Sequence, residues 1–275
     1  MVNPRKHGAP PYRTAVIHGG PGAAGEMAPV GEELARSGQG ILEPFQTSRS
    51  LDGQVRELAD LLGSDATLPV SLLGFSWGAW LSLIVAARYP RVVRKLILVG
   101  AAPFAPEYAA EIQETRLSRL TPSRRVEFQR AVEALAESNG VEADQSLARL
   151  EALTRITDHY DPVSPAETCD DGPAPDGKIF QKVWTEAAEL RRSGQLLEIG
   201  SRVQCPVVAI HGDYDPHPAR GVKEPLSGVI DDFRFVLLGR CGHKPWIERH
   251  ARPTFLEWAR KELEFETPPE TGVHV

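Results

Sequence analysis

The sequence predicts an α/β fold in which a mostly parallel central sheet of about six strands carries an inserted helical region. Short apolar, β-branched runs alternate with helical patterns before residue 103 and after about residue 200. Strands that alternate with helices pair in parallel, and nearly continuous apolar runs are typical of a sheet covered on both faces. Between these two parts the alternation stops and the pattern becomes helical, which indicates the insertion.

The strands and helices of the two flanking parts can be placed from their patterns. The predicted strands are 14–18, 40–45, 70–75, 95–101, 206–212 and 233–238. The predicted helices are 31–38 with Gly38 as C-cap, 51–63, 76–89, and 247–263, in which Pro253 starts a new turn or introduces a kink.

The inserted region contains three helical patterns. The first begins at Thr121 and Pro122, an N-cap and N1 pair, and ends at Gly140; the third spans 178–194 and is closed by Gly194. Between them, an apolar stripe marks the second helix: Leu147, Leu150, Leu153 and Ile156. Residues 161–178, rich in Pro, Gly and Asp, are predicted as a loop. We therefore predict a core of 1–103 and 200–265, a helical cap of 104–199 and a flexible tail of 266–275.

The composition limits the classes of function. A chain of 275 residues has room for one large domain with an insertion, or for two small domains. Its net charge is -6 and it has no basic stripe, so nucleic acid is not an expected partner. No apolar segment follows the early basic residues, and no run approaches the about 18 residues of a membrane span. We expect a cytoplasmic protein that does not bind membranes; the oligomeric state stays open.

Neither a disulfide framework nor a metal centre is indicated. Cys169, Cys205 and Cys241 lie far apart without C-x-x-C spacing and are predicted to be plain thiols. No His, Asp and Glu spacing suggests a metal, and no glycine-rich nucleotide motif follows a strand. The sequence thus predicts a protein without a metal or cofactor.

The stretch GFSWGAW, residues 74–80, places Ser76 between two glycines directly after a predicted strand. A sharp strand-to-helix turn presses the residues two before and two after the serine against each other, and Gly74 and Gly78 meet that demand. Such a turn lifts the hydroxyl clear of the sheet. A five-residue match arises often by chance, so an ordinary strand-loop-helix junction remains an alternative.

Three further stretches follow predicted strands: HGGPG (18–22), HGDYDP (211–216) and CGHKPW (241–246). Open parallel sheets place their ligand crevices just past the carboxyl ends of the strands, where all three lie. Together with Ser76 they supply a serine, an aspartate and a histidine in the chain order of one serine-triad fold.

On these motifs the sequence resembles the α/β-hydrolase family, and within it the proline iminopeptidase-like branch that pairs HGGPG with a G-x-S-W-G elbow. The resemblance covers 14–103 and 200–264, and the insertion takes the place of the family's helical cap. It implies Ser76 as nucleophile, His243 as general base and then acid, and Asp215 as the residue that orients the imidazole. The chemistry agrees, because a serine hydroxyl is a weak nucleophile until a base removes its proton.

An oxyanion hole requires two convergent backbone N–H groups. Trp77, at the start of a predicted helix, supplies one, and HGGPG supplies the second through Gly20, with Gly19 as the alternative. For the acid we favour Asp215 over Asp213, which we expect to brace its loop.

The other histidines are assigned structural roles. His18 and His211 end buried strands and are expected to make structural hydrogen bonds, although either could line the crevice. The rest are predicted on the surface or in loops: His7, His159, His217, His250 and His274.

The sequence departs from the iminopeptidase pattern in two places. The N-terminal hairpin is reduced, and EPFQTSRSL (43–51) replaces an acidic-glutamine-arginine-glycine element. We therefore expect hydrolysis of an ester or amide of a small molecule, with a proline aminopeptidase and a non-catalytic ligand-binding homologue as alternatives.

The substrate must be set by the cap. An aminopeptidase needs carboxylates for the free amine, and the loop offers Glu167, Asp170, Asp171 and Asp176, though a solvated acidic loop is the commoner explanation. An ester pocket could instead use four aromatic residues whose alternative role is core packing: Phe104, Tyr108, Phe180 and Trp184.

Overall fold

The computed structural model describes residues 3–22, 24–137, 141–163 and 176–263. At its centre is a seven-stranded sheet with the order β1-β3-β2-β4-β5-β6-β7. β1 (Arg5–His7) is antiparallel to β3 (Gly40–Glu43), and the other neighbouring pairs are parallel. The remaining strands are β2 (Tyr12–Ile17), β4 (Val70–Phe75), β5 (Val93–Val99), β6 (Val207–Gly212) and β7 (Phe233–Leu238). The mostly parallel sheet is confirmed, with β1 as a strand beyond the six predicted from the sequence.

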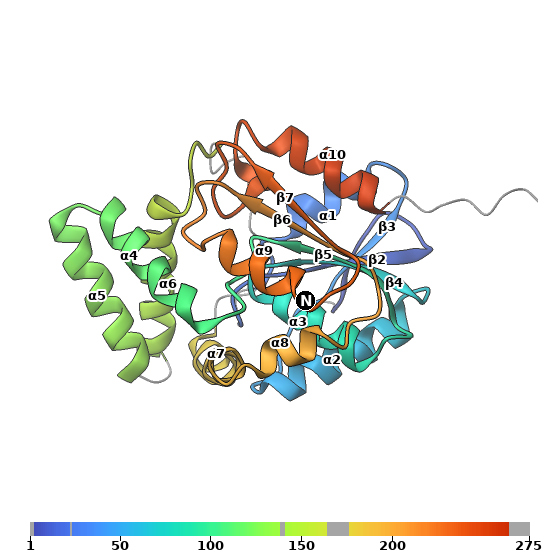
Figure 1. The fold of residues 1–275 in the computed structure, drawn as a ribbon, viewed down its shortest axis with the longest axis horizontal. Helices are drawn as coiled ribbons and strands as arrows, with labels where there is room; N and C mark the ends of the chain where they lie inside the picture. Colours follow the sequence, from blue (N-terminus) through green and yellow to red (C-terminus); the bar gives the residue numbers. More distant parts are fainter. Residues whose placement is uncertain (1–2, 23, 138–140, 164–175, 264–275) are drawn as a thin grey trace, which may run out of the picture.

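Helices cover both faces of this sheet (Figure 1). α1 (Ala28–Ala35) and α10 (Arg252–Leu263) lie on one face, and α2 (Leu51–Asp65), α3 (Trp77–Arg88) and α8 (Gln195–Gly200) lie on the other. Side chains alternate along a strand, so Val208 packs with the α1 and α10 cluster, whereas Val207 and Ala209 pack with the α2 and α3 cluster. Because both faces are covered, successive residues of a strand must all be apolar, and this explains the continuous apolar runs in the sequence.

The inserted region forms a lobe beside the sheet (Figure 1). It comprises the short 3-10 helix η1 (Pro106–Tyr108), α4 (Ala109–Arg119), α5 (Pro122–Glu137) and α6 (Val141–Thr157). The lobe has small apolar clusters of its own, one of them built from Leu120, Phe128 and Leu153. α7 (Gly177–Arg192) belongs instead to the main core through Ile179 and Val183. The cap boundaries 104–199 stay a prediction, and the predicted tail 266–275 lies outside the described residues.

The remaining helices differ from the sequence expectation in detail. α4, α8 and α9 (Arg220–Ser227) were not predicted. The last predicted helix is divided into the 3-10 helix η3 (Pro245–Ile247) and α10, which begins at Arg252. Pro253 therefore lies in the first turn of α10, where a proline is tolerated because its missing N–H would have no partner there.

The parallel strands end at one common edge of the sheet. Their registers pair Ile17 with Gly74, Phe75 with Val99, and Gly212 with Leu238. The residues that follow β2, β4, β6 and β7 consequently emerge at the same edge, and the four motifs singled out in the sequence lie there.

Candidate active site

Ser76 occupies a strained turn between β4 and α3. Its backbone has φ 51 and ψ -112. A positive φ at a non-glycine residue costs of order 1–3 kcal/mol and persists only where the surroundings enforce it. A Cβ on Gly74 would lie 2.3 Å from the carbonyl oxygen of Gly78, and a Cβ on Gly78 would lie 2.4 Å from that of Ile17. Only glycine fits at both positions, as the sequence analysis predicted.

His243 lies beside this turn. Its ring contacts the ring of Phe75, the residue before Ser76, with centroids 4.7 Å apart. The residue is 8% exposed, so the imidazole does not face bulk water. The loop after β7 thus brings an imidazole next to the serine turn.

Asp215 is the aspartate that contacts His243. Its Oδ2 lies 2.7 Å from Nδ1 of His243, and its side chain is fully buried. Burial opposes the charged form, yet the surrounding imidazoles of His243, His217 and His211 hold the pKa of Asp215 well below its ordinary value. Asp213 instead accepts the backbone N–H of Cys241 at 3.1 Å and braces the loop, as expected from the sequence.

The HGGPG loop distinguishes between its two glycine N–H groups. The N–H of Gly19 donates to Oε1 of Glu26 at 2.8 Å and is occupied. Gly20 adopts φ 48, in the left-handed region that favours glycine, and its N–H has no hydrogen-bond partner within the part of the chain that the structure describes. Trp77 is the first residue of α3, where N–H groups have no carbonyl one turn earlier. Gly20 and Trp77 therefore offer the free donors.

An ion pair joins the HGGPG loop to the histidine loop. Oε2 of Glu26 lies 2.5 Å from Nζ of Lys244, the residue after His243. Burial raises the pKa of the Glu26 carboxyl, but Lys244 outweighs it and the net pKa is lowered. Glu26 is thus a carboxylate that contacts both loops, through Gly19 on one side and Lys244 on the other.

The histidine loop is also attached to the inserted region. The N–H of His243 donates to the carbonyl of Asp158, just after α6, at 2.7 Å. The buried carboxylate of Glu248 accepts N–H groups from Gly242 at 3.0 Å, Tyr160 at 2.9 Å and Asp161 at 2.8 Å. Glu248 therefore connects the loop that carries the imidazole with the exit of the inserted lobe.

A partly buried ion pair lies next to this attachment. Arg116 of α4 contacts the carboxylate of Asp158 through two nitrogens, Nε at 2.9 Å and Nη2 at 2.5 Å. Burial raises the pKa of the Asp158 carboxyl, but Arg116 dominates and the pKa is lowered. Arg116 is thus a paired cation where it approaches the histidines.

The other histidines correct part of the sequence expectation. His217 lies in a loop, as the prediction of surface or loop positions allows, although it is only 7% exposed; His7 is 8% exposed and lies in β1, so the prediction is wrong for His7. The His159 side chain is buried as well, at an ion-pair distance from Glu248, whereas His250 is exposed as predicted. Carboxylates bury these rings: Glu43 contacts His7 and Glu248 contacts His159 from distant segments, whereas Asp215 contacts His217 from two residues earlier in the same loop. His274 lies outside the described residues.

His18 and His211 make the structural hydrogen bonds that were expected. Nδ1 of His18 lies 2.7 Å from the carbonyl oxygen of Gly19, and Nε2 of His211 lies 2.8 Å from that of His217. Both rings are buried.

Asp215, His217 and His243 carry donor atoms of types that metals use, all within 4.8 Å of one another. Nδ1 of each histidine already contacts an oxygen of Asp215. We interpret the group as a hydrogen-bonded network, since each of these nitrogens is engaged with the carboxylate.

The described residues among the candidates for substrate binding in the cap have structural roles. Asp176 caps α7 by accepting the N–H groups of Lys178 and Ile179, which weakens its case as an amine-binding carboxylate. Phe104 is fully buried and packs on Trp80, so core packing accounts for it. Tyr108 donates to Glu224, and Phe180 and Trp184 stack on each other. The remaining acidic candidates, Glu167, Asp170 and Asp171, lie outside the described residues.

Two of the cysteines can be described, and both are free thiols. Burial raises the pKa of Cys205 to about 11 and raises that of Cys241 as well, so both stay protonated near neutral pH. They behave as the plain thiols that the sequence predicted, and Cys169 lies outside the described residues.

Comparison with known proteins identifies the family. Residues 50–250 match the model of the family described as "alpha/beta hydrolase fold". The chain therefore belongs to the α/β-hydrolase family, as the motifs suggested. No helix among the described residues is long and apolar enough to cross a membrane; the cytoplasmic location stays a prediction.

Individual relatives agree on the fold and differ in activity. A pimeloyl-[acyl-carrier protein] methyl ester esterase of Chromobacterium violaceum is 25% identical over 195 residues, which cover 69% of each chain. The crystal structure of VinJ aligns with a TM-score of 0.65 at 19% identity, over 94% of this chain and 93% of that one. A proline iminopeptidase of Mycobacterium smegmatis aligns with a TM-score of 0.57 at 17% identity, over 94% and 93%. The iminopeptidase is one of several structural neighbours, so the branch suggested by HGGPG is not singled out.

Sequence reasoning missed the groups that support the site. Three of these groups make contacts between segments far apart in the chain: Glu26, Lys244 and Glu248. The fourth, His217, contacts Asp215 because the turn between them folds back. For His217 a signal was available, because it stands two residues after Asp215 in the same loop.

Proposed function

We propose that the protein is a serine hydrolase that cleaves a carboxylic ester of a small molecule through an acyl-enzyme on Ser76. His243 is the general base and then the acid, and Asp215 orients its imidazole. Gly20 and Trp77 donate their N–H groups to the oxyanion. The observation that carries the proposal is the buried 2.7 Å contact between Asp215 and His243, located beside a serine held at a positive φ.

The reaction follows from these positions. The Ser76 oxygen attacks the ester carbonyl carbon while Nε2 of His243 takes the hydroxyl proton, and the carbonyl oxygen becomes an oxyanion. As the tetrahedral intermediate collapses, the bond to the leaving alcohol breaks and His243 returns the proton to it. Water then attacks the acyl-enzyme, again with His243 as base, and releases the carboxylic acid and the free serine.

The buried carboxylate explains why His243 suits this role. Asp215 accepts the proton on Nδ1, which leaves Nε2 free to take a proton, and its negative charge stabilises the imidazolium formed during attack. Preorganised N–H groups at the oxyanion are commonly the largest single contribution to such catalysis. The occupied N–H of Gly19 favours Gly20 as the second donor.

An ester is favoured over an N-terminal peptide bond as the substrate. The curated relative named above is a methyl ester esterase, and a monoacylglycerol lipase of Paleococcus ferrophilus shares the fold with a TM-score of 0.61. An aminopeptidase would need a carboxylate for the substrate amine, and Asp176 is already engaged as a helix cap. Proline aminopeptidase activity is therefore an outcome that the test distinguishes.

The test offers p-nitrophenyl acetate, p-nitrophenyl butyrate and prolyl-p-nitroanilide to the wild type and to S76A, D215N and D213N. We expect ester turnover by the wild type, and loss of about three orders of magnitude or more in kcat for S76A and D215N. D213N should retain activity within about tenfold, since its side chain braces the loop and does not contact His243.

Each other outcome has a definite meaning. Cleavage of the prolyl substrate alone would replace the esterase by an aminopeptidase. Fluorophosphonate labelling of Ser76 without turnover of any substrate would favour a ligand-binding homologue. An inactive D213N beside an active D215N would overturn the assignment of the acid.

A further inference from the structure

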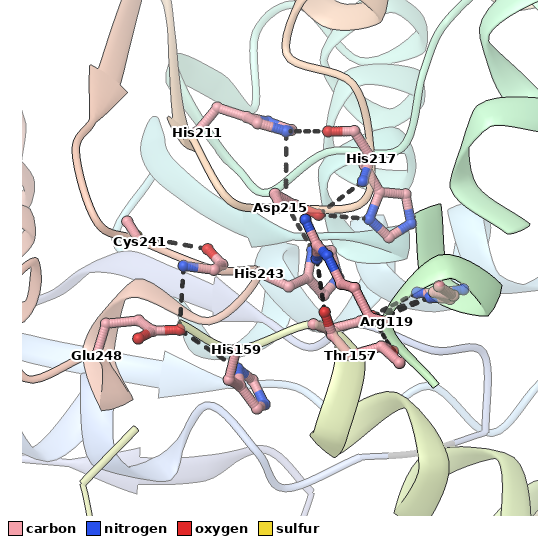
Figure 2. A network of polar contacts seen from close by, with 12 residues as sticks. Arg119, Thr157, His159, His211, Asp215, His217, Cys241, His243 and Glu248 are labelled. Carbon is pink, nitrogen blue, oxygen red and sulfur yellow. Dashed lines mark hydrogen bonds and ion pairs between the residues drawn. The ribbon is translucent and has the colours of Figure 1, made fainter. Parts of the chain in front are cut away.

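Asp215 has both carboxylate oxygens engaged by histidines (Figure 2). Oδ2 contacts Nδ1 of His243 at 2.7 Å. Oδ1 contacts Nδ1 of His217 at 2.8 Å and the backbone N–H of the same residue at 2.9 Å. The carboxylate is therefore held from both sides by imidazole rings.

The hydrogen bonds determine which ring nitrogens carry protons. An ionised carboxylate only accepts, so Nδ1 must be protonated in both His217 and His243, and Nε2 is bare in each ring while it is neutral. Burial lowers the pKa of His217 to about 4, against the opposing effect of Asp215, so this ring is neutral at pH 7. Nε2 of His211 lies 2.8 Å from the His217 carbonyl and thus fixes the backbone of the turn.

The two rings on Asp215 also contact each other. The ring centroids of His217 and His243 are 4.4 Å apart, with planes inclined by 25°. An imidazolium at His243 can rest on a neutral ring, whereas two charged rings at this distance would repel strongly. The charged groups near His217 include Arg116 and Asp158 of the inserted lobe, which pair with each other.

From this geometry we infer that His217 is a positioning residue of the proposed hydrolase, which holds Oδ1 of Asp215 so that Oδ2 is aimed at His243. The inference rests on the proposed function. The second imidazole also shares the charge of the carboxylate, and this moderates how strongly Asp215 stabilises the imidazolium of His243. An imidazolium that is less strongly stabilised by Asp215 is a stronger acid, so it returns its proton to the leaving alcohol more readily.

Two substitutions separate the parts of this role. H217N places a side-chain N–H near the position of Nδ1 and can still donate to Oδ1, whereas H217F keeps an aromatic ring for stacking and the backbone N–H donor but removes the side-chain donor. We expect H217F to lower kcat for p-nitrophenyl butyrate by about tenfold with KM unchanged within about twofold, as for loss of a hydrogen bond to a charged group. H217N should recover most of kcat. H250N is the matched control, because His250 is exposed and its side chain lies 3.5 Å from Asp161, a residue that does not contact Asp215.

The pH profile supplies a readout that a merely structural role would not move. Without the side-chain donor of His217, the charge of Asp215 is shared with fewer partners, namely His211 at 3.4 Å and the backbone N–H of residue 217, and it stabilises the protonated form of His243 more strongly. The acidic limb of kcat/KM should therefore move to higher pH in H217F, by about half a unit, and stay near the wild-type position in H217N.

A spectroscopic measurement tests the arrangement without turnover. In ¹⁵N-histidine NMR of the full-length S76A variant, His217 and His243 should both show the Nδ1–H tautomer, and His217 should remain neutral down to about pH 4. An Nε2–H tautomer at His217 would overturn the inference. If the wild type turned over the ester and the pH profile of H217F matched that of the wild type, the inference about His217 would be overturned while the proposed function would stand. Absence of any wild-type turnover would remove the proposed function, and with it this role.

Discussion

Replacing Glu248 by glutamine tests how the histidine loop is held against the inserted lobe. The carboxylate is fully buried and accepts N–H groups of Gly242, Tyr160 and Asp161 at 2.8–3.0 Å. In E248Q one oxygen becomes an NH₂ group that faces an N–H donor. Loss of a hydrogen bond to a charged acceptor costs about 1.5–3 kcal/mol, and the backbone donor left unsatisfied costs about 1–3 kcal/mol. We expect the free energy of unfolding to fall by about 3–5 kcal/mol.

Urea unfolding followed by tryptophan fluorescence measures this change. The control is E257Q, which removes the same charge from an exposed position on α10 and should stay within about 0.5 kcal/mol of the wild type. A melting temperature lower by roughly 10 °C should accompany the loss in E248Q. If E248Q were as stable as E257Q, the carboxylate would not hold the three N–H groups as described.

The pH dependence gives an independent check on the same residue. Burial raises the pKa of Glu248, but the contact with His159 and the backbone N–H groups outweigh it and lower the pKa below its ordinary value. A carboxyl with a lowered pKa contributes stability above its unfolded pKa of about 4.3 and loses that contribution as the pH falls through the folded value. The stability difference between wild type and E248Q should therefore be largest near neutral pH and shrink in acid. A difference that grew below pH 4 would contradict this reasoning.

Two further substitutions address the serine turn and the HGGPG loop. G78A would place a Cβ 2.4 Å from the carbonyl oxygen of Ile17, so we expect the free energy of unfolding to fall by more than about 2 kcal/mol and fluorophosphonate labelling to be lost. The control is G63A, whose Cβ would lie in open space on α2; this substitution should raise the free energy of unfolding by about 0.5–1 kcal/mol. Urea titrations of both variants measure these changes. E26Q removes the charge that pairs with Lys244. We expect kcat to fall about 3- to 10-fold and the free energy of unfolding to fall by only about 1 kcal/mol. Steady-state kinetics measure the first change and urea unfolding measures the second. An unchanged kcat in E26Q would mean that this pair does not position the two loops.

The sheet could be predicted from the sequence because of its burial. Strands β2 to β6 are covered on both faces, so apolar residues fill consecutive positions and the runs are unmistakable. α4 escaped prediction because none of its residues is buried, and a helix without a buried face shows no apolar stripe. α9 contains Pro225, which reads as a helix breaker in a linear sequence.

The candidate site was predictable to the extent that its residues follow strands. Ser76, Asp215 and His243 each stand just past a strand, and parallel pairing brings strand ends together. His217 was predicted at a surface or loop position; it lies in a loop, but its burial could not be predicted because it depends on how the turn after Asp215 folds back. Glu248 showed no local signal, since two of its partners are main-chain groups 87 and 88 residues away.

The attachment at the exit of α6 uses main-chain atoms on the side of the lobe: the carbonyl of Asp158 and the amides of Tyr160 and Asp161. Such atoms are present whatever side chains surround them. Helices grafted from another member of the family in place of α4 to α6 should therefore leave the imidazole where it is, provided that the junction falls before Asp158 and that the graft keeps an arginine at the position of Arg116, which pairs with the Asp158 carboxylate. Recombination at that point offers a route to new substrate preferences on an unchanged set of reacting groups.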